Sequence, residues 1–341
     1  QRLINEREGV YRTLSKIYYY QHELGLPWAV AEEQGFNTLY NLEMMRRRGI
    51  ADSLLHHAKY LSQVPYVRES RRMEGMDILV ADDMQRGDKA RHVPTAIAIG
   101  DYFMDLHHTY EALERDLDRE GYSQESGPFQ VPFAVFIPKQ LDGFLPAEKN
   151  FSQSRLASGA TRLQPITMLT GQAVGIMASL SISKGIPPRQ LKPYSVQLSL
   201  LEQGATLVPR WYKDIEWGTD LWIATQLLSL YNILDKPGNL EHRDGMEFVP
   251  EHDWQADAAL SGTEAWNALN KLAVLLGYKV KDGKASLPAA GQVSYGQLKK
   301  MAASLNSSFL RALQPYMPAT TQAVTHGSLA LVCLDMIKAN R

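Results

Sequence analysis

One continuous stretch, residues 155–175, constrains the fold more than any other part of the chain. It runs into an apolar segment that we predict to be a helix. This helix should extend from near Thr170 to a stop signal at Gly185, where a cation precedes the glycine and two prolines follow. Gly171 and Gly175 lie one turn apart, which predicts a face of small residues that a strand or a flat ligand can approach closely. The free N–H groups and positive dipole end of the first turn suit an electron-rich oxygen. Packing of the helix against a strand is the simpler explanation of the same glycines.

The motif that begins at Arg162, Arg-Leu-Gln-Pro-Ile-Thr followed after five residues by Ala-Val-Gly, resembles the C-terminal flavin motif of FAD-dependent oxidoreductases. Segments at residues 66–75, at 96–107 and between 131 and 147 resemble the same family in the same order. The resemblance covers roughly residues 60–210 and is strongest to a subgroup labelled xanthan-lyase-like. It implies FAD as the cofactor and an α/β fold, with a β-sheet substrate domain and a layered FAD-binding part of two or three layers.

The glycine motif that seats the FAD pyrophosphate is missing from the sequence. In such flavoproteins the first strand–turn–helix carries Gly-x-Gly-x-x-Gly, which places the pyrophosphate at a helix N-terminus. We therefore interpret the chain as the C-terminal portion of a flavoprotein. Its partner would be an upstream dinucleotide-binding segment, in the same or another chain. We expect the chain by itself to hold only the isoalloxazine end of FAD and to bind the cofactor poorly.

Three residues are candidates for catalysis. The resemblance implies that Arg162 grips a substrate carboxylate, a task that suits the two parallel hydrogen bonds of a guanidinium. It also favours His107 as proton donor or acceptor, with Asp105 two residues earlier on the same face of a strand to orient the imidazole. The alternatives are an arginine that braces the loop through backbone carbonyls and a His–Asp pair with a structural role. No third ligand accompanies this pair, so we predict no metal site.

The resemblance also assigns contacts with the flavin to residues beside the predicted helix start. The residues so assigned are Thr170, Gly171, Gln172, Ala173, Lys149 and Asn150.

Composition excludes some classes of function. The 341 residues carry 36 basic and 37 acidic side chains, a net charge of −1 that gives no electrostatic footprint for nucleic acid. The single cysteine excludes an intrachain disulfide. No uninterrupted run of about 18 apolar residues is present, so we predict no membrane span.

The chain should divide near residue 210. We predict helices up to residue 62, strands over residues 64–146, then the flavin-type loop and helix, and a short helix from Pro193 to Gln203. Residues 211–341 should form an all-α repeat module of stacked units. Similar segments begin at Leu260, Val293 and Val324, which lie 33 and 31 residues apart. Two of these segments contain capping boxes, Ser261 with Glu264 and Ser294 with Gln297.

The three segments resemble degenerate S-layer-homology repeats, but all lack the arginine of that family's signature. A packing or docking role is therefore favoured over binding to an anionic wall polymer. The sequence leaves the compartment open, with the periplasm or cell envelope as one alternative.

The favoured function is transfer of a hydride between flavin and a small organic or sugar-derived substrate. A non-enzymatic envelope or scaffold protein on a flavoprotein fold, and a polysaccharide lyase, remain as alternatives.

Overall fold

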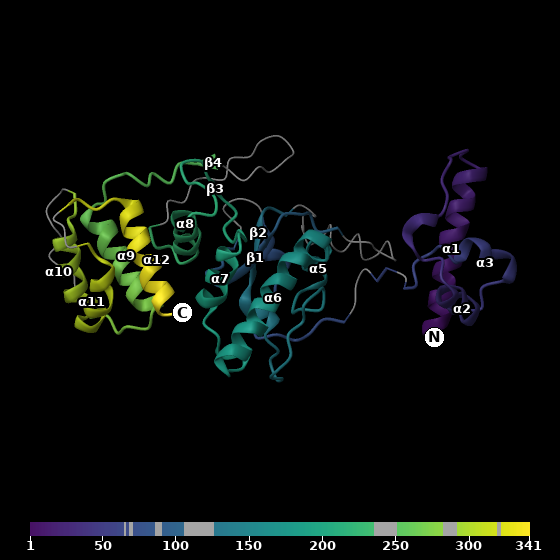
Figure 1. The fold of residues 1–341 in the computed structure, drawn as a ribbon, viewed down its shortest axis with the longest axis horizontal. Coiled ribbons are helices and arrows are strands. Elements are labelled where there is room, and N and C mark those ends of the chain that lie inside the picture. The colour runs from purple at the N-terminus through teal and green to yellow at the C-terminus, as the bar shows by residue number, and fades with distance from the viewer. Residues whose placement is uncertain are drawn as a thin grey trace. The chain divides into compact units, whose positions relative to one another are not determined.

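The computed structural model describes residues 1–64, 66–67, 71–85, 91–105, 126–234, 251–281, 292–318 and 322–341. The chain divides into two compact units, Gln1–Arg68 and Glu69–Arg341. Figure 1 shows the elements of each unit, and each is described by itself below.

The first unit is helical, as the sequence predicts. It contains α1 (Arg2–His22), the short η1 (Glu32–Gln34), α2 (Leu39–Arg47) and α3 (Asp52–Ala58). Its core is small and consists of the buried residues Val10, Met45, Ile50, Leu55 and Ala58.

A buried ion pair joins α1 to the end of α2. Nε of Arg48 donates to Oε2 of Glu6 across 2.9 Å, and both side chains are almost fully covered. Arg48 also donates to the carbonyl of Gln63, and Arg2 donates to Glu6 from one turn away. The first unit therefore combines a few apolar contacts with one charge cluster.

The second unit begins with a two-stranded antiparallel sheet covered by helices. Strand β1 (Ala96–Gly100) pairs with β2 (Phe129–Pro132), with a bulge between Ala96 and Ala98. Both α6 (Gln164–Lys184) and α7 (Pro193–Glu202) pack on β1 and on each other. The remaining elements around the sheet are η2 (Ala81–Met84), η4 (Phe133–Phe136), α5 (Arg155–Thr161) and η5 (Pro188–Gln190). Among the described residues this pair is the main sheet, which is compatible with an α/β flavoprotein domain.

Buried glutamines connect this sheet to the loops around it. Nε2 of Gln197 donates to the carbonyls of Pro94 (2.8 Å) and Ala96 (2.9 Å), while its Oε1 accepts from the Tyr231 hydroxyl. Oε1 of Gln226 accepts from two successive backbone N–H groups, those of Leu207 and Val208. Each amide satisfies buried backbone groups in or beside the loops, since buried N–H and C=O groups require hydrogen-bond partners.

Residues 211–341 continue the same unit. The short parallel pair β3 (Trp211–Tyr212) and β4 (Glu251–His252) flanks α8 (Asp220–Leu230). The later helices are α9 (Gly262–Leu275), α10 (Tyr295–Leu305), α11 (Ser307–Leu313), the short η6 (Gln314–Tyr316) and α12 (His326–Ala339).

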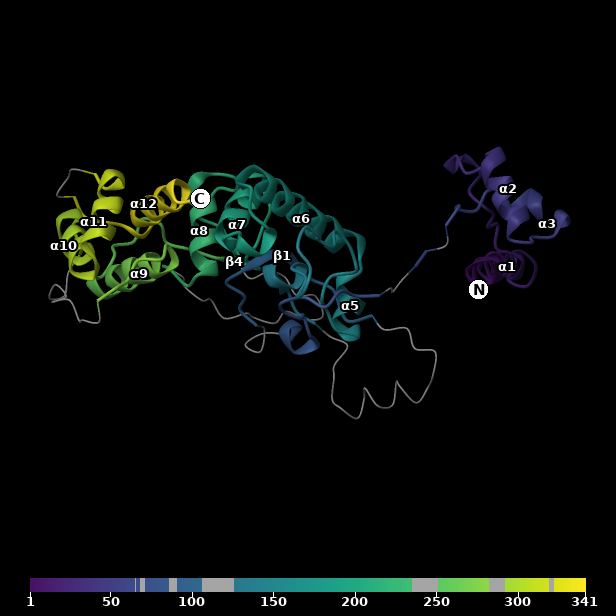
Figure 2. The same ribbon diagram turned by 90° about the horizontal axis from the view of Figure 1, so that it is seen from below.

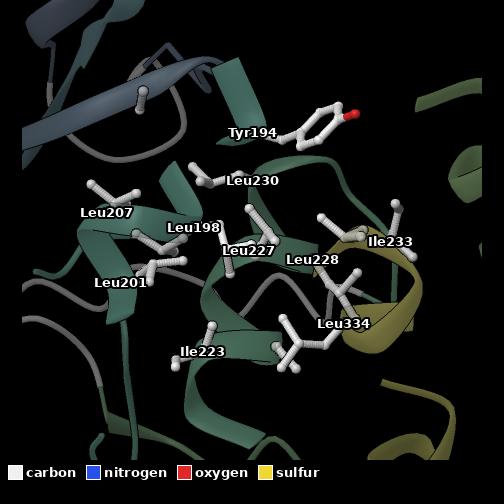
Figure 3. Close-up of a cluster of buried hydrophobic side chains, with 14 of the residues drawn as sticks. Tyr194, Leu198, Leu201, Leu207, Ile223, Leu227, Leu228, Leu230, Ile233 and Leu334 are labelled. Carbon is white, nitrogen blue, oxygen red and sulfur yellow. The ribbon is translucent and has the colours of Figure 1, made fainter. Parts of the chain in front are cut away.

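Helix α8 packs against α7 on one side and α12 on the other, as both ribbon views show (Figures 1 and 2). The contact between these helices is apolar (Figure 3). Its labelled side chains are Tyr194, Leu198, Leu201, Leu207, Ile223, Leu227, Leu228, Leu230, Ile233 and Leu334. One hydrophobic cluster extends from Leu79 to Ile337 and so includes residues on both sides of the predicted division near residue 210. That division stays a prediction.

The three similar segments all open helices with capping boxes. The two predicted boxes are confirmed, and a third pairs Thr325 with Ser328.

The residues before these caps form a closed ring of backbone hydrogen bonds, which we call the cap ring. The N–H of Leu260 donates to the carbonyl of Val324 (3.2 Å), that of Val324 to Val293 (2.8 Å), and that of Val293 to Leu260 (3.2 Å). All three side chains are fully buried. The three segments are thus joined in a cycle of backbone hydrogen bonds.

Candidate functional site

Helix α6 begins earlier than the sequence predicts. Its first residue is Gln164 rather than a residue near Thr170, and Pro165 occupies the first turn. Proline is suited to that place because its fixed φ matches the helix and its missing N–H has no partner there to lose. Gly171 and Gly175 consequently lie in the helix interior, away from its N-terminal N–H groups. The positive end of the helix dipole therefore lies at Gln164 and Ile166, and not at the glycines as predicted.

The start of α6 has no side-chain cap. Its N-cap residue is Leu163, in extended conformation, and Thr167 donates the first hydrogen bond of the helix, to the carbonyl of Leu163. The N–H groups of Gln164 and Ile166 come before that bond, and neither donates to any described residue. This turn therefore presents two donors at the positive end of a 21-residue helix.

Arg162 lies directly before this turn and is 3% exposed. Its Nη2 donates to Oδ2 of Asp105 and to the backbone carbonyl of Asp105, both at 2.8 Å. Its Nε donates to the carbonyl of Gly159 at 3.4 Å. Two backbone carbonyls and one carboxylate thus hold the guanidinium, which is the geometry expected of a bracing arginine.

Gly159 allows this contact because a side chain there would be crowded by the backbone of residues 104–105. A Cβ on Gly159 would lie 3.0 Å from the carbonyl oxygen of Asp105 and 3.1 Å from its nitrogen. The backbone of residues 104–105 therefore passes directly over α5. Sequence reasoning missed this role of Gly159, and the pairing of Asp105 with Arg162, because the partners lie 57 positions apart and no local spacing indicates them.

The glycines of α6 differ in their surroundings. A Cβ on Gly171 would lie 3.4 Å from the carbonyl oxygen of Ala147, so another part of the chain already packs close to this glycine. Nothing lies within 4 Å of a Cβ on Gly175. Met168 and Ile182, seven residues to either side of Gly175, are 74% and 81% exposed. This helix face is uncovered and carries no charge.

The predicted flavin contacts are not brought together as one surface. Thr170 and Ala173 are fully buried, and the Thr170 hydroxyl donates within the helix, to the Thr167 carbonyl. Gln172 is half-buried and donates to Gln203 at 3.4 Å.

The two polar residues before the motif lie in a loop that packs on an earlier segment. Nδ2 of Asn150 donates to the carbonyl of Arg71 (2.6 Å), and the carbonyl of Asn150 accepts from Met73. The Lys149 carbonyl accepts from Gln153. These contacts give Asn150 a bracing role.

The remaining catalytic candidate, His107, lies outside the described residues. Its pairing with Asp105 therefore stays a prediction. Within the described ranges no group of three metal-ligating side chains is present.

Helix α6 is long and apolar enough, by length and composition, to cross a membrane, and 33% of the relevant window is buried in the unit. Core helices of water-soluble proteins meet the same criteria. Here α6 packs on β1 and α7. The prediction of no membrane span stays a prediction.

Comparison with known proteins gives one match. Residues 6–200, more than half of the 341-residue chain, match the family described as FAD dependent oxidoreductase. No curated protein and no solved structure matches. The matched range contains β1, β2, α5 and α6, and therefore the braced turn before the uncapped helix. The chain belongs to the FAD dependent oxidoreductase family, whose cofactor is FAD.

Proposed function

We propose that the chain is the C-terminal portion of a flavoenzyme that moves a hydride between FAD and a small organic or sugar-derived substrate. The observation that carries this proposal is the family match across the uncapped start of α6. When bound, FAD supplies the ring that accepts or donates the hydride. The protein's part is orientation and electrostatics.

The described residues fit one end of the cofactor. The N–H groups of Gln164 and Ile166 suit the electron-rich pyrimidine edge of an isoalloxazine ring and favour negative charge that develops there. The sequence offers no Gly-x-Gly-x-x-Gly cradle for the pyrophosphate. An upstream dinucleotide-binding segment would supply it. The exposed face of α6 around Gly175 carries no charged side chain, which supports contact with that segment.

His107 would exchange the proton that accompanies hydride transfer. An imidazole suits this role because its ordinary pKa is close to neutrality. Asp105, which holds Arg162, lies two residues before it in the sequence.

Residues 211–341 would act as a packing module, related to S-layer-homology repeats, rather than as a wall-binding one. The cap ring and the shared core with α7 support this reading. Membership of the xanthan-lyase-like subgroup, and a place in the cell envelope, are parts of the same proposal.

The test is a titration of the purified chain with FAD, riboflavin and ADP, followed by flavin fluorescence and visible absorption. If only the ring end is bound, FAD and riboflavin should bind with similar weak affinity and ADP should not compete. A chain that purifies with stoichiometric FAD, or that binds FAD much more tightly than riboflavin, contradicts the missing pyrophosphate site.

The same titration separates the alternatives. A chain that binds neither flavin supports the scaffold protein. Release of unsaturated uronate ends from an acidic polysaccharide without flavin supports the lyase.

A further inference from the structure

We infer that Arg162 is a positioning residue that, with Asp105 and Gly159, fixes the first turn of α6. The relevance of this turn to flavin rests on the proposed function, whereas the clamp itself rests only on the contacts of these three residues. It assigns Arg162 a different role from the substrate grip that the family resemblance implies.

The donors of the guanidinium are mostly in use. Of its five N–H groups, both on Nη2 go to Asp105 and the one on Nε goes to Gly159. The two that remain are both on Nη1. A side-on grip of a carboxylate needs donors from two different nitrogens. Arg162 therefore cannot offer two donors from different nitrogens to a substrate carboxylate while it holds Asp105.

The clamp acts across the junction between two helices. Arg162 is the C-cap of α5, and its N–H donates to the carbonyl of Ser158. Leu163, the next residue, is the N-cap of α6. With one residue between the clamp and Gln164, a rotation of Arg162 would redirect the first N–H groups of α6.

Both ends of the junction are fixed to the sheet region. Before the junction, Gly159 lies against the backbone of Asp105, which follows β1 by five residues. After it, Ile166 is buried, and its Cδ1 is one of the atoms that a Cβ on Gly100 would meet, at 2.8 Å. The turn whose first N–H groups have no partner among the described residues is therefore fixed from both sides, and Arg162 supplies the polar contacts on one side.

Two substitutions test the clamp. Arg162→Gln removes the ion pair and shortens the side chain, and Asp105→Asn keeps the backbone carbonyl but removes the charge. The matched control is Arg189→Gln, because Arg189 also donates to an aspartate, Asp142, and to two backbone carbonyls. Arg189 lies beyond the C-terminal end of α6, in η5.

The first readout is hydrogen exchange of the full chain. We expect the amides of residues 167–170 to exchange about tenfold faster in Arg162→Gln and less so in Asp105→Asn, with those of α7 unchanged. The control should leave residues 167–170 at the wild-type rate. The clamp is contradicted if amide exchange in α7 accelerates as much as at residues 167–170. It is also contradicted if exchange at residues 167–170 accelerates in neither variant. If Arg162→Gln does not fold, Asp105→Asn decides by the same criterion.

The second readout is the visible spectrum of added riboflavin at saturating concentration. We expect Arg162→Gln to lose the spectral shift that the wild type induces, while Arg189→Gln keeps it. Faster exchange at residues 167–170 with an unchanged flavin spectrum leaves the clamp standing and refutes the proposed flavin position. Failure of the clamp and failure of the proposed flavin position therefore give different results.

Discussion

At the scale of single residues, buried polar side chains join separate segments of the chain. Gln197 and Gln226 bind backbone groups in the second unit, Arg162 binds the carbonyls of Asp105 and Gly159, and Arg48 binds Glu6 in the first unit. Such groups cost free energy when a partner is removed, because the other is left buried and unsatisfied. Apart from the contact of Arg162 with Gly159, three positions away, these pairings join residues that are distant in sequence, so no local sequence pattern indicates them.

Glu6 should make the first unit sensitive to acid. Hydrogen bonds from the guanidinium groups of Arg2 and Arg48 hold the pKa of Glu6 below its usual value. Because the folded-state pKa is lowered, the stabilisation is complete above the unfolded-state pKa and is lost as pH falls through the folded-state pKa. We expect hydrogen exchange in α1 to accelerate over this acid range in the wild type.

The variant Glu6→Gln should be less stable at neutral pH and show a flatter acid dependence. Glu8→Gln is the control, since Glu8 is exposed. Equal acid dependence in all three proteins would rule out the role of Glu6.

At the scale of helices and strands, helix ends and starts were predicted correctly where a local sequence signal marks them. The stop of α6 at Gly185 is as predicted, with the glycine in the left-handed region at φ 64°. The capping boxes of α9 and α10 are also confirmed. The start of α6 was misplaced because Leu163 provides no side-chain cap, and packing of Ile166 on the sheet fixes it instead. The predicted site has the same limit: the sequence motif gives no indication of the contacts of Arg162 with Asp105 and Gly159.

Two helical glycines should respond to alanine with opposite signs. Gly175→Ala should raise the free energy of unfolding by about 0.5–1 kcal/mol, because alanine is the better helix former and the space beside Gly175 is open. Gly159→Ala should lower it by about 1–3 kcal/mol, because the new Cβ would meet the backbone of Asp105. Urea denaturation of both variants measures the change in the free energy of unfolding. A change of the same sign in both variants would contradict the difference in surroundings described for the two glycines.

At the scale of the whole molecule, the second unit joins the family-matched part to the C-terminal helices. Besides the apolar contact of α7, α8 and α12, Lys338 pairs with Asp220 (2.8 Å) and Arg341 with Glu202 (2.6 Å). The predicted division near residue 210 followed a change in composition. Composition does not report which helices share a core.

Loss of a side chain in this contact should therefore affect both parts together. Leu334→Ala should lower the free energy of unfolding by about 2–5 kcal/mol, because Leu334 is buried between α12 and α8. Leu331→Ala in the same helix is the control, as Leu331 is 38% exposed. Hydrogen exchange should show α7 and α12 opening together in Leu334→Ala. Opening of α12 alone would indicate a separable module.

The cap ring limits how this part of the molecule can change in evolution. An open array of helical repeats has free ends and can lengthen by duplication of a unit. In the cap ring every segment already has a neighbour on both sides, because Val324 returns to Leu260. A fourth copy would have no place to insert without opening one of the three bonds. Closure of the ring therefore fixes the number of segments at three. Evolutionary change in this part of the chain is then confined to the loops between the helices.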